Sequence, residues 1–118
     1  MIEKRDFYIN GAWVAPAVAK DHPVIDPATE EQCAVISLGG QADTDAAVAA
    51  ARAAFDSWSQ TSKEERTRLI EKLKEVYIAR QEEMAQAMSQ EMGAPIDLSR
   101  AQQVGAGSWH IDGFLKAF

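Results

Sequence analysis

The sequence changes character near residue 40, and this change constrains the fold more than any other feature. Before it, short apolar runs are separated by turn signals; after it, apolar residues recur at spacings of three and four. We therefore expect an α+β chain with strand pairs over residues 1–40 and three or four helices over 41–118. A length of 118 residues suits one small domain, so the two parts should together form one partial domain, truncated at its C-terminal end.

Two turn signals predict the strand pairs. Asn10-Gly11 separates residues 7–9 from Trp13 and Val14, and a type I′ hairpin turn needs positive φ at both central positions. In the second pair, Val24 and Ile25 lead into Asp26-Pro27, and residues 33–36 run back. Asp26 can accept a hydrogen bond from the backbone two residues on, and proline presets the turn.

Capping residues and apolar spacing predict three helices. The first should run from Asp43, its cap, to about Trp58; the second should start with a capping box of Ser62 and Glu65 and stop at Gly93. The predicted apolar face of the first helix is Val48, Ala51, Phe55 and Trp58, and that of the second is Leu69, Leu73, Val76 and Tyr77. The second stripe lapses at residues 80–81, which indicates a bend or two consecutive helices.

The third helix is expected from about Leu98 to the end of the chain. Its predicted apolar face is Ala101, Val104, Ser108, Ile111, Leu115 and Phe118. Three glycines interrupt it, at 105, 107 and 113, and each costs roughly 1 kcal/mol relative to alanine. A helical glycine often marks close approach by another backbone. Because the chain stops within an amphipathic pattern and without a cap, we expect a cut end.

Charge and composition exclude several partners. The net charge is −6 and the pI about 4.8, without a cluster of Lys and Arg, which argues against nucleic acid or an anionic membrane as partner. No apolar run could span a bilayer, and the first ten residues lack the apolar core of a signal peptide. With a single cysteine and no export signal, a cytoplasmic location is expected.

Three stretches, in order, resemble the N-terminal part of the aldehyde dehydrogenase superfamily. They are FYINGAWV, VIDPATEEQCAVISLGG and ADTDAAVAAARAAFDSWSQTSKEERTRLIEKL, followed by EMGAP. One departure is Ala94, where lysine is common in the family. The resemblance implies that these strands and helices form the outer part of the family's cofactor-binding α/β domain.

The resemblance also implies a function for a longer protein. Family members oxidise aldehydes to carboxylic acids with NAD or NADP through a cysteine thiohemiacetal. They are several times longer than this chain, and their catalytic and nucleotide-binding residues lie beyond the position matching Phe118. We therefore expect no catalytic and no cofactor-binding residue here, and no NAD or NADP bound to this chain alone. The expected partners are the remainder of the polypeptide and further copies in a homo-oligomer.

Cys33 is interpreted as a strand residue and not as a nucleophile. A nucleophilic cysteine needs an electropositive setting or a nearby base, but the residues before this one are Glu30, Glu31 and Gln32. The family's nucleophile sits in a Gly-Gln-x-Cys type of loop, which Gln32-Cys33 does not match in spacing. Free cysteine usually behaves as a small buried hydrophobe.

The histidines and glycines carry no site of their own. His22 is expected in a loop and His110 in a packing role on the last helix; with one cysteine, nothing supports a zinc site. Gly39-Gly40 precedes a helix whose N-terminus could hold an anion, but Asp43 and Asp45 already place negative charge there. No glycine motif for a nucleotide is present.

One metal hypothesis remains. Glu91 falls in the last turn of the second helix, where unpaired carbonyls make a carboxylate mildly unfavourable unless a cation binds. Many aldehyde dehydrogenases resemble this arrangement and hold a monovalent cation with an acid at this helix end and with carbonyls before the strand turn. The matching positions are Val24, Ile25 and Glu91, and the ion would be Na⁺ or K⁺. The alternative is a solvated glutamate.

Two classes of function stay open at this point. The chain is either the N-terminal fragment of an NAD(P)-dependent aldehyde dehydrogenase, inert by itself, or a stand-alone helical interaction module. The module would grip a partner with the apolar faces of residues 48–58 and 101–118. A reading frame that continues past Phe118 favours the fragment, and an immediate stop codon leaves the module.

Overall fold

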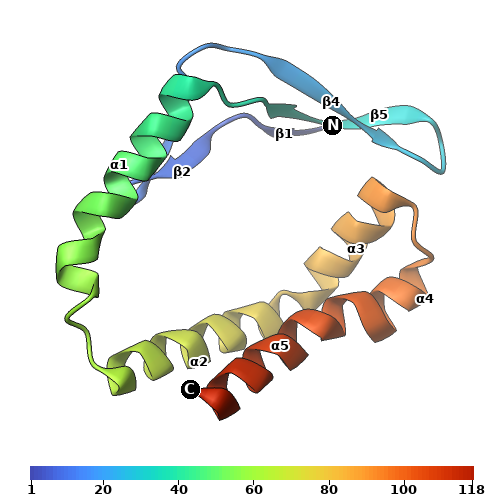
Figure 1. Cartoon of the computed structure of the whole chain (residues 1–118). Coiled ribbons are helices and arrows are strands. Elements are labelled where there is room, and N and C mark those ends of the chain that lie inside the picture. Colours follow the sequence, from blue (N-terminus) through green and yellow to red (C-terminus); the bar gives the residue numbers. More distant parts are fainter. The chain divides into compact units, whose positions relative to one another are not determined.

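The computed structural model describes all 118 residues and divides them into two compact units, residues 1–60 and 61–118. The first unit holds all five strands and α1, and the second holds the remaining helices (Figure 1). The α+β class, with strands followed by helices, is confirmed, and the change falls between β5 and α1. The grouping of residues 1–40 and 41–118 into one partial domain stays a prediction.

The Asn-Gly hairpin forms as predicted. Strand β2 (Phe7–Ile9) pairs antiparallel with β3 (Ala12–Val14). Both turn residues have positive φ, 53° at Asn10 and 78° at Gly11, as a type I′ turn requires. Tyr8 and Trp13 lie opposite each other with ring centroids 5.2 Å apart in an edge arrangement.

A three-stranded sheet with the order β1-β5-β4 completes the β-structure of the first unit. Its strands are β1 (Ile2–Lys4), β4 (Asp21–Asp26) and β5 (Glu31–Ser37). The predicted turn between β4 and β5 is confirmed, because the Asp26 carboxylate accepts the Ala28 N–H at 2.8 Å. Pro23 is tolerated in β4 because this strand lies at the sheet edge.

Strand β1 was not expected. It pairs in parallel with β5, Ile2 opposite Ala34 and Lys4 opposite Ile36. Its three residues include two charges and show no alternation that would mark a strand. The hydrogen bonds that define β1 come from a segment about thirty positions later, which a local pattern cannot reveal.

The start of α1 (Gln41–Trp58) corrects one expectation. Gly40 and not Asp43 is the N-cap, so the cap lies three residues earlier than predicted and the helix starts at Gln41. Asp43 lies at the third helical position, where its carboxylate accepts the Gly40 N–H at 2.8 Å and the Ala17 N–H at 2.7 Å. An acid at this position reaches back to the cap and satisfies a free backbone donor as well as a capping side chain would.

The second unit consists of two helical segments that lie side by side (Figure 1). Its elements are α2 (Lys63–Ala79), α3 (Gln81–Met92), α4 (Ile96–Leu98), the π-turn η1 (Ser99–Gln103) and α5 (Val104–Ala117). Ser62 caps α2 by accepting the Glu65 N–H at 3.0 Å, and Gly93 ends α3 with φ 71°, both as predicted. The lapse in the apolar stripe at 80–81 is a break between consecutive helices.

Only part of the predicted apolar stripe of α2, chiefly Tyr77, meets α5. The Tyr77 hydroxyl donates to the Val104 carbonyl at 2.8 Å, and Lys74 pairs with Asp112. The other members of the predicted stripe are exposed: Leu69, Leu73 and Val76. An apolar stripe marks a face suited to burial, but it does not say which element will cover it.

Of the three glycines in α5, Gly107 alone is crowded within this chain. A Cβ there would lie at 2.2 Å from the Tyr77 hydroxyl oxygen, whereas nothing lies within 4 Å of such an atom at Gly105 or Gly113. The expected close approach is thus made at one glycine, and by a side chain instead of a backbone.

Little apolar surface is buried in either unit. The accessible surface is 8670 Å², whereas even two separate compact domains of half the mass each would expose about 7600 Å². The predicted apolar face of α1 is exposed at Val48, Phe55 and Trp58. The buried residues are Ala34, Val35, Ser37, Ala85, Ala94, Ser99 and Val104. The apolar side chains predicted on the face of α1 are therefore largely exposed in this chain.

Substitution of Gly107 tests the contact between α2 and α5. We expect Gly107→Ala to lower the free energy of unfolding by about 1–3 kcal/mol, because the new methyl group overlaps Tyr77. The matched control Gly113→Ala should raise it by about 0.5–1 kcal/mol, because this position is open and alanine favours helix. Urea unfolding followed by circular dichroism measures both, and equal effects would contradict the assignment.

An ion pair between α3 and η1 gives the second unit a pH dependence. Arg100 donates to the Glu82 carboxylate at 2.6 and 2.9 Å, which lowers the pKa of Glu82 from 4.5 to about 2. The contribution of this ion pair to the free energy of unfolding is therefore complete above about pH 4.5 and is lost as the pH falls toward 2. Glu82→Gln should lower the urea midpoint at pH 7. Near pH 2 the midpoints of the variant and of the parent chain should be equal. In an Arg100→Gln background the same substitution should change little at either pH; an unchanged effect there would exclude the pair as its cause.

Candidate functional site

Cys33 occupies the extra position of a β-bulge. Val24 pairs with Ala34, and Ile25 pairs with Gln32, so Cys33 has no partner across the two strands. Its partly buried thiol donates to the Val24 carbonyl at 3.4 Å. No group of three or more His, Cys, Asp or Glu side chains in the chain comes together to hold a metal ion. The thiol thus serves the strand pair, as the sequence indicated.

The two histidines lie apart on different elements. His22 lies exposed in β4 opposite Ile36, so the expectation of a loop residue is wrong; the strand extends farther back than the turn signals suggest. His110 is exposed on α5, with its ring centroid 4.9 Å from that of Trp109. Neither histidine belongs to a group of three or more side chains that could hold a metal ion.

The N-terminus of α1 is filled by the chain's own carboxylate. Asp43 accepts the N–H of Gly40, and its bonds to Gly40 and Ala17 lower the pKa of Asp43 below its usual value. A phosphate approaching this helix end would be repelled by the Asp43 carboxylate, which already accepts the Gly40 N–H. Gly39 lies beside the Phe7 ring, which a Cβ there would meet at 3.4 Å, an ordinary contact distance. The Gly39-Gly40 pair is a strand-to-helix turn and not a phosphate loop.

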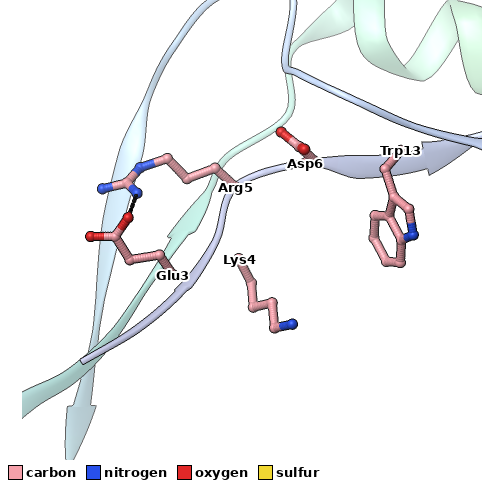
Figure 2. Close-up of a pocket in the computed structure, with 5 residues that line it drawn as sticks. All are labelled: Glu3, Lys4, Arg5, Asp6 and Trp13. Carbon is pink, nitrogen blue, oxygen red and sulfur yellow. Dashed lines mark hydrogen bonds and ion pairs between the residues drawn. The ribbon is translucent and has the colours of Figure 1, made fainter.

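A charged hollow of about 330 Å³ lies beside β1, and Figure 2 shows its lining. It is lined by Glu3, Lys4, Arg5, Asp6 and Trp13. Arg5 bonds Glu3 at 2.6 Å and Asp21 at 3.0 Å, and these bonds raise the pKa of Arg5. The arginine is therefore neutralised by its own neighbours. Sequence reasoning missed this cluster, because Arg5, just after β1, and Asp21, in β4, are 16 positions apart.

The residues of the cation hypothesis lie in both units. Val24 and the exposed Ile25 lie in β4 opposite the bulge at Cys33, and Glu91 lies exposed in the last turn of α3. The Val24 carbonyl already accepts the Cys33 thiol, a weak donor that leaves it a second lone pair. Carbonyl and carboxylate oxygens suit Na⁺ or K⁺ chemically. The site itself stays a prediction.

The fold can be compared with those of known proteins. The model of the aldehyde dehydrogenase family matches residues 13–117. This match takes in nearly all of the chain, including the Asn-Gly hairpin's second strand, the bulged pair and every helix. The chain belongs to the aldehyde dehydrogenase family, a family of oxidoreductases.

Individual relatives agree with this assignment. The 3-succinoylsemialdehyde-pyridine dehydrogenase of a Pseudomonas species is 45% identical over 94% of this chain and 24% of its own length. The crystal structure of an aldehyde dehydrogenase from Bartonella henselae is 51% identical, with a TM-score of 0.98 over 99% of this chain and 25% of that chain. An aldehyde dehydrogenase from Mycobacterium tuberculosis, complexed with NAD⁺, is 30% identical, with a TM-score of 0.91 over 98% of this chain and 24% of that one. This chain spans about a quarter of these relatives.

Substitution of Asp43 tests the assignment of the α1 N-terminus. Asp43→Asn should lower the urea midpoint at pH 7, because the carboxylate that holds two backbone donors is lost. Since the folded-state pKa is lowered, the difference from the parent chain should shrink as the pH falls below the usual aspartate range. Asp45→Asn, which removes only a bond from Gln41, is the matched control and should change little. A larger effect at Asp45 than at Asp43 would refute the assignment.

Proposed function

We propose that this chain is the N-terminal segment of an NAD(P)-dependent aldehyde dehydrogenase. The whole protein would oxidise an aldehyde to a carboxylic acid through a cysteine thiohemiacetal. The observation that carries this proposal is the near-complete overlap of the chain with about a quarter of each relative, combined with a lone thiol that bonds a backbone carbonyl. The segment supplies scaffold, and the bond-making groups belong to the remaining polypeptide.

NAD or NADP would be bound outside these residues. The relative from Mycobacterium tuberculosis is complexed with NAD⁺, and a mutant of aldehyde dehydrogenase C from Pseudomonas syringae, 49% identical, is complexed with NAD⁺ and octanal. In this chain the one glycine pair before a helix is closed by Asp43, so its residues do not fit a dinucleotide phosphate. The cofactor would supply hydride acceptance in the whole enzyme, and no step of that chemistry is assigned to this segment.

The uncovered apolar side chains support the remainder of the polypeptide as the main partner. Phe55 and Trp58 on α1 and Leu73 on α2 are exposed, although such side chains are favoured in contact with other protein. We also propose a homo-oligomeric, cytoplasmic parent protein. None of the helices is both long and apolar enough to pass through a membrane, and the net charge of −6 disfavours nucleic acid.

A stand-alone helical interaction module is the second candidate. The exposed apolar residues of α1, together with Trp109 and Phe114 on α5, favour it, because a partner protein could cover them as well as further polypeptide could. The two candidates differ in the gene. A frame that continues past Phe118 into a nucleotide-binding region supports the enzyme segment, and a stop codon there supports the module.

A turnover assay tests the proposal that the catalytic groups lie outside this chain. The purified 118-residue chain, mixed with a medium-chain aldehyde and NAD⁺ or NADP⁺, should produce no reduced cofactor, because it has no activated thiol. A full-length relative assayed in parallel is the positive control. In the full-length parent, Cys33→Ala should leave kcat unchanged, because this thiol bonds a backbone carbonyl and no reacting group. Turnover by the short chain, or loss of kcat in the variant, would contradict the proposal.

We retain the monovalent cation as part of the proposal, with Val24 and Ile25 carbonyls and the Glu91 carboxylate as ligands. In the whole protein, replacing Na⁺ and K⁺ by choline should lower the melting temperature, because an ion bound to the folded state stabilises it. Glu91→Gln should lower the melting temperature in Na⁺ or K⁺. It should also remove the difference in melting temperature between these ions and choline. A variant that keeps the full ion dependence would exclude Glu91 as a ligand.

A further inference from the structure

Two side chains in the last helical segment are fully buried although they stand five residues apart. Ser99 is 0% exposed and Val104 is 1% exposed. In an α-helix each residue turns by about 100°, so residues five apart point about 140° away from each other and cannot share one face. A continuous α-helix would therefore bury one of these side chains and expose the other.

The π-turn η1 resolves this conflict. The Val104 N–H bonds the Ser99 carbonyl, so residues five apart stack as residues four apart do in an α-helix. We call the buried residues Ser99 and Val104 the two anchors. The segment between them thus contains one residue more than an α-helix needs to place both side chains on one face. The extra residue lies on the solvent-exposed side of the turn, because Arg100, Ala101 and Gln102 are all exposed. This also explains why Ala101, predicted on the apolar face, is exposed instead.

Both anchors are held by side-chain contacts. The Ser99 hydroxyl donates to the Gln103 amide oxygen at 3.0 Å, and Tyr77 holds the Val104 carbonyl from α2. Arg100 ties the turn to Glu82 on α3 with two bonds. The burial of Ser99 and Val104, together with the contacts of Val104 with α2 and of Arg100 with α3, favours keeping the extra residue in the turn.

We propose that η1 is a register device that fixes the rotation of α5 against α2 and α3. It sets which side of α5 faces Tyr77, where Gly107 is the residue that leaves room. It thereby sets the direction in which Trp109 and Phe114, 71% and 49% exposed, are presented to a partner. The inference concerns the second unit by itself and holds whether or not the chain belongs to a longer enzyme.

Two single-residue deletions in the 118-residue chain test the device. Deletion of Gln102 should leave the urea midpoint equal to or above that of the parent chain, because the two anchors become four residues apart and a plain α-helix joins them. Deletion of Ala106, also exposed, should abolish the cooperative transition or lower its midpoint, because Ser108 then takes the place of Gly107 beneath Tyr77. A crystal structure of the Gln102 deletion should show an unbroken helix that keeps the bond from Tyr77 to Val104.

The urea unfolding results of the two deletions decide between the register device and its alternatives. A tolerated Gln102 deletion beside a damaging Ala106 deletion supports the register device. Equal effects of the two deletions, whether both harmless or both destructive, overturn it. A tolerated Gln102 deletion that loses the Tyr77 contact in its crystal structure overturns it as well, because the rotation of α5 would then not depend on the turn.

Discussion

The second unit depends on the place where Tyr77 crosses α5. Its hydroxyl reaches the Val104 carbonyl because Gly107 has no side chain to obstruct the ring. Val104 is buried at this point, and the π-turn that precedes it brings Ser99 onto the same face. A glycine and an extra residue in the preceding turn thus both serve one contact between two helical segments. The ion pairs of Lys74 with Asp112 and of Arg100 with Glu82 also join the two segments.

The first unit is held in a similar way, by polar contacts at a few points around a thin interior. Asp43 ties the start of α1 to the loop at Ala17, and Arg5 ties β1 to β4 through Asp21. Exposed ion pairs of this kind contribute little stability each, so they direct the chain more than they stabilise it. A segment that leaves aromatic side chains of α1 exposed is physically suited to be covered. This is the property expected of scaffold within a larger member of its family.

The elements that the sequence predicts well are those fixed by local chemistry. Asn10-Gly11, the Asp26 turn, the Ser62 cap and the Gly93 stop each act within four residues, and each forms as expected. What local patterns could not reveal depends on distant partners. β1 exists through β5, and the π-turn exists because buried contacts fix both of its ends. The structural interpretation of Cys33 followed from its neighbours, but its position in a bulge depends on the strand register. The pairing of Val24, Ile25 and Glu91 with a cation came from resemblance, and it is a chemical expectation only.

The central claim is that this chain carries no reaction centre, and the reactivity of its one thiol tests that claim most directly. The rate of Cys33 alkylation by iodoacetamide at neutral pH can be compared with the rate for free glutathione. A partly buried thiol bonded to the Val24 carbonyl should react no faster than glutathione. Alkylation many times faster than glutathione would reveal an activated nucleophile and contradict the account.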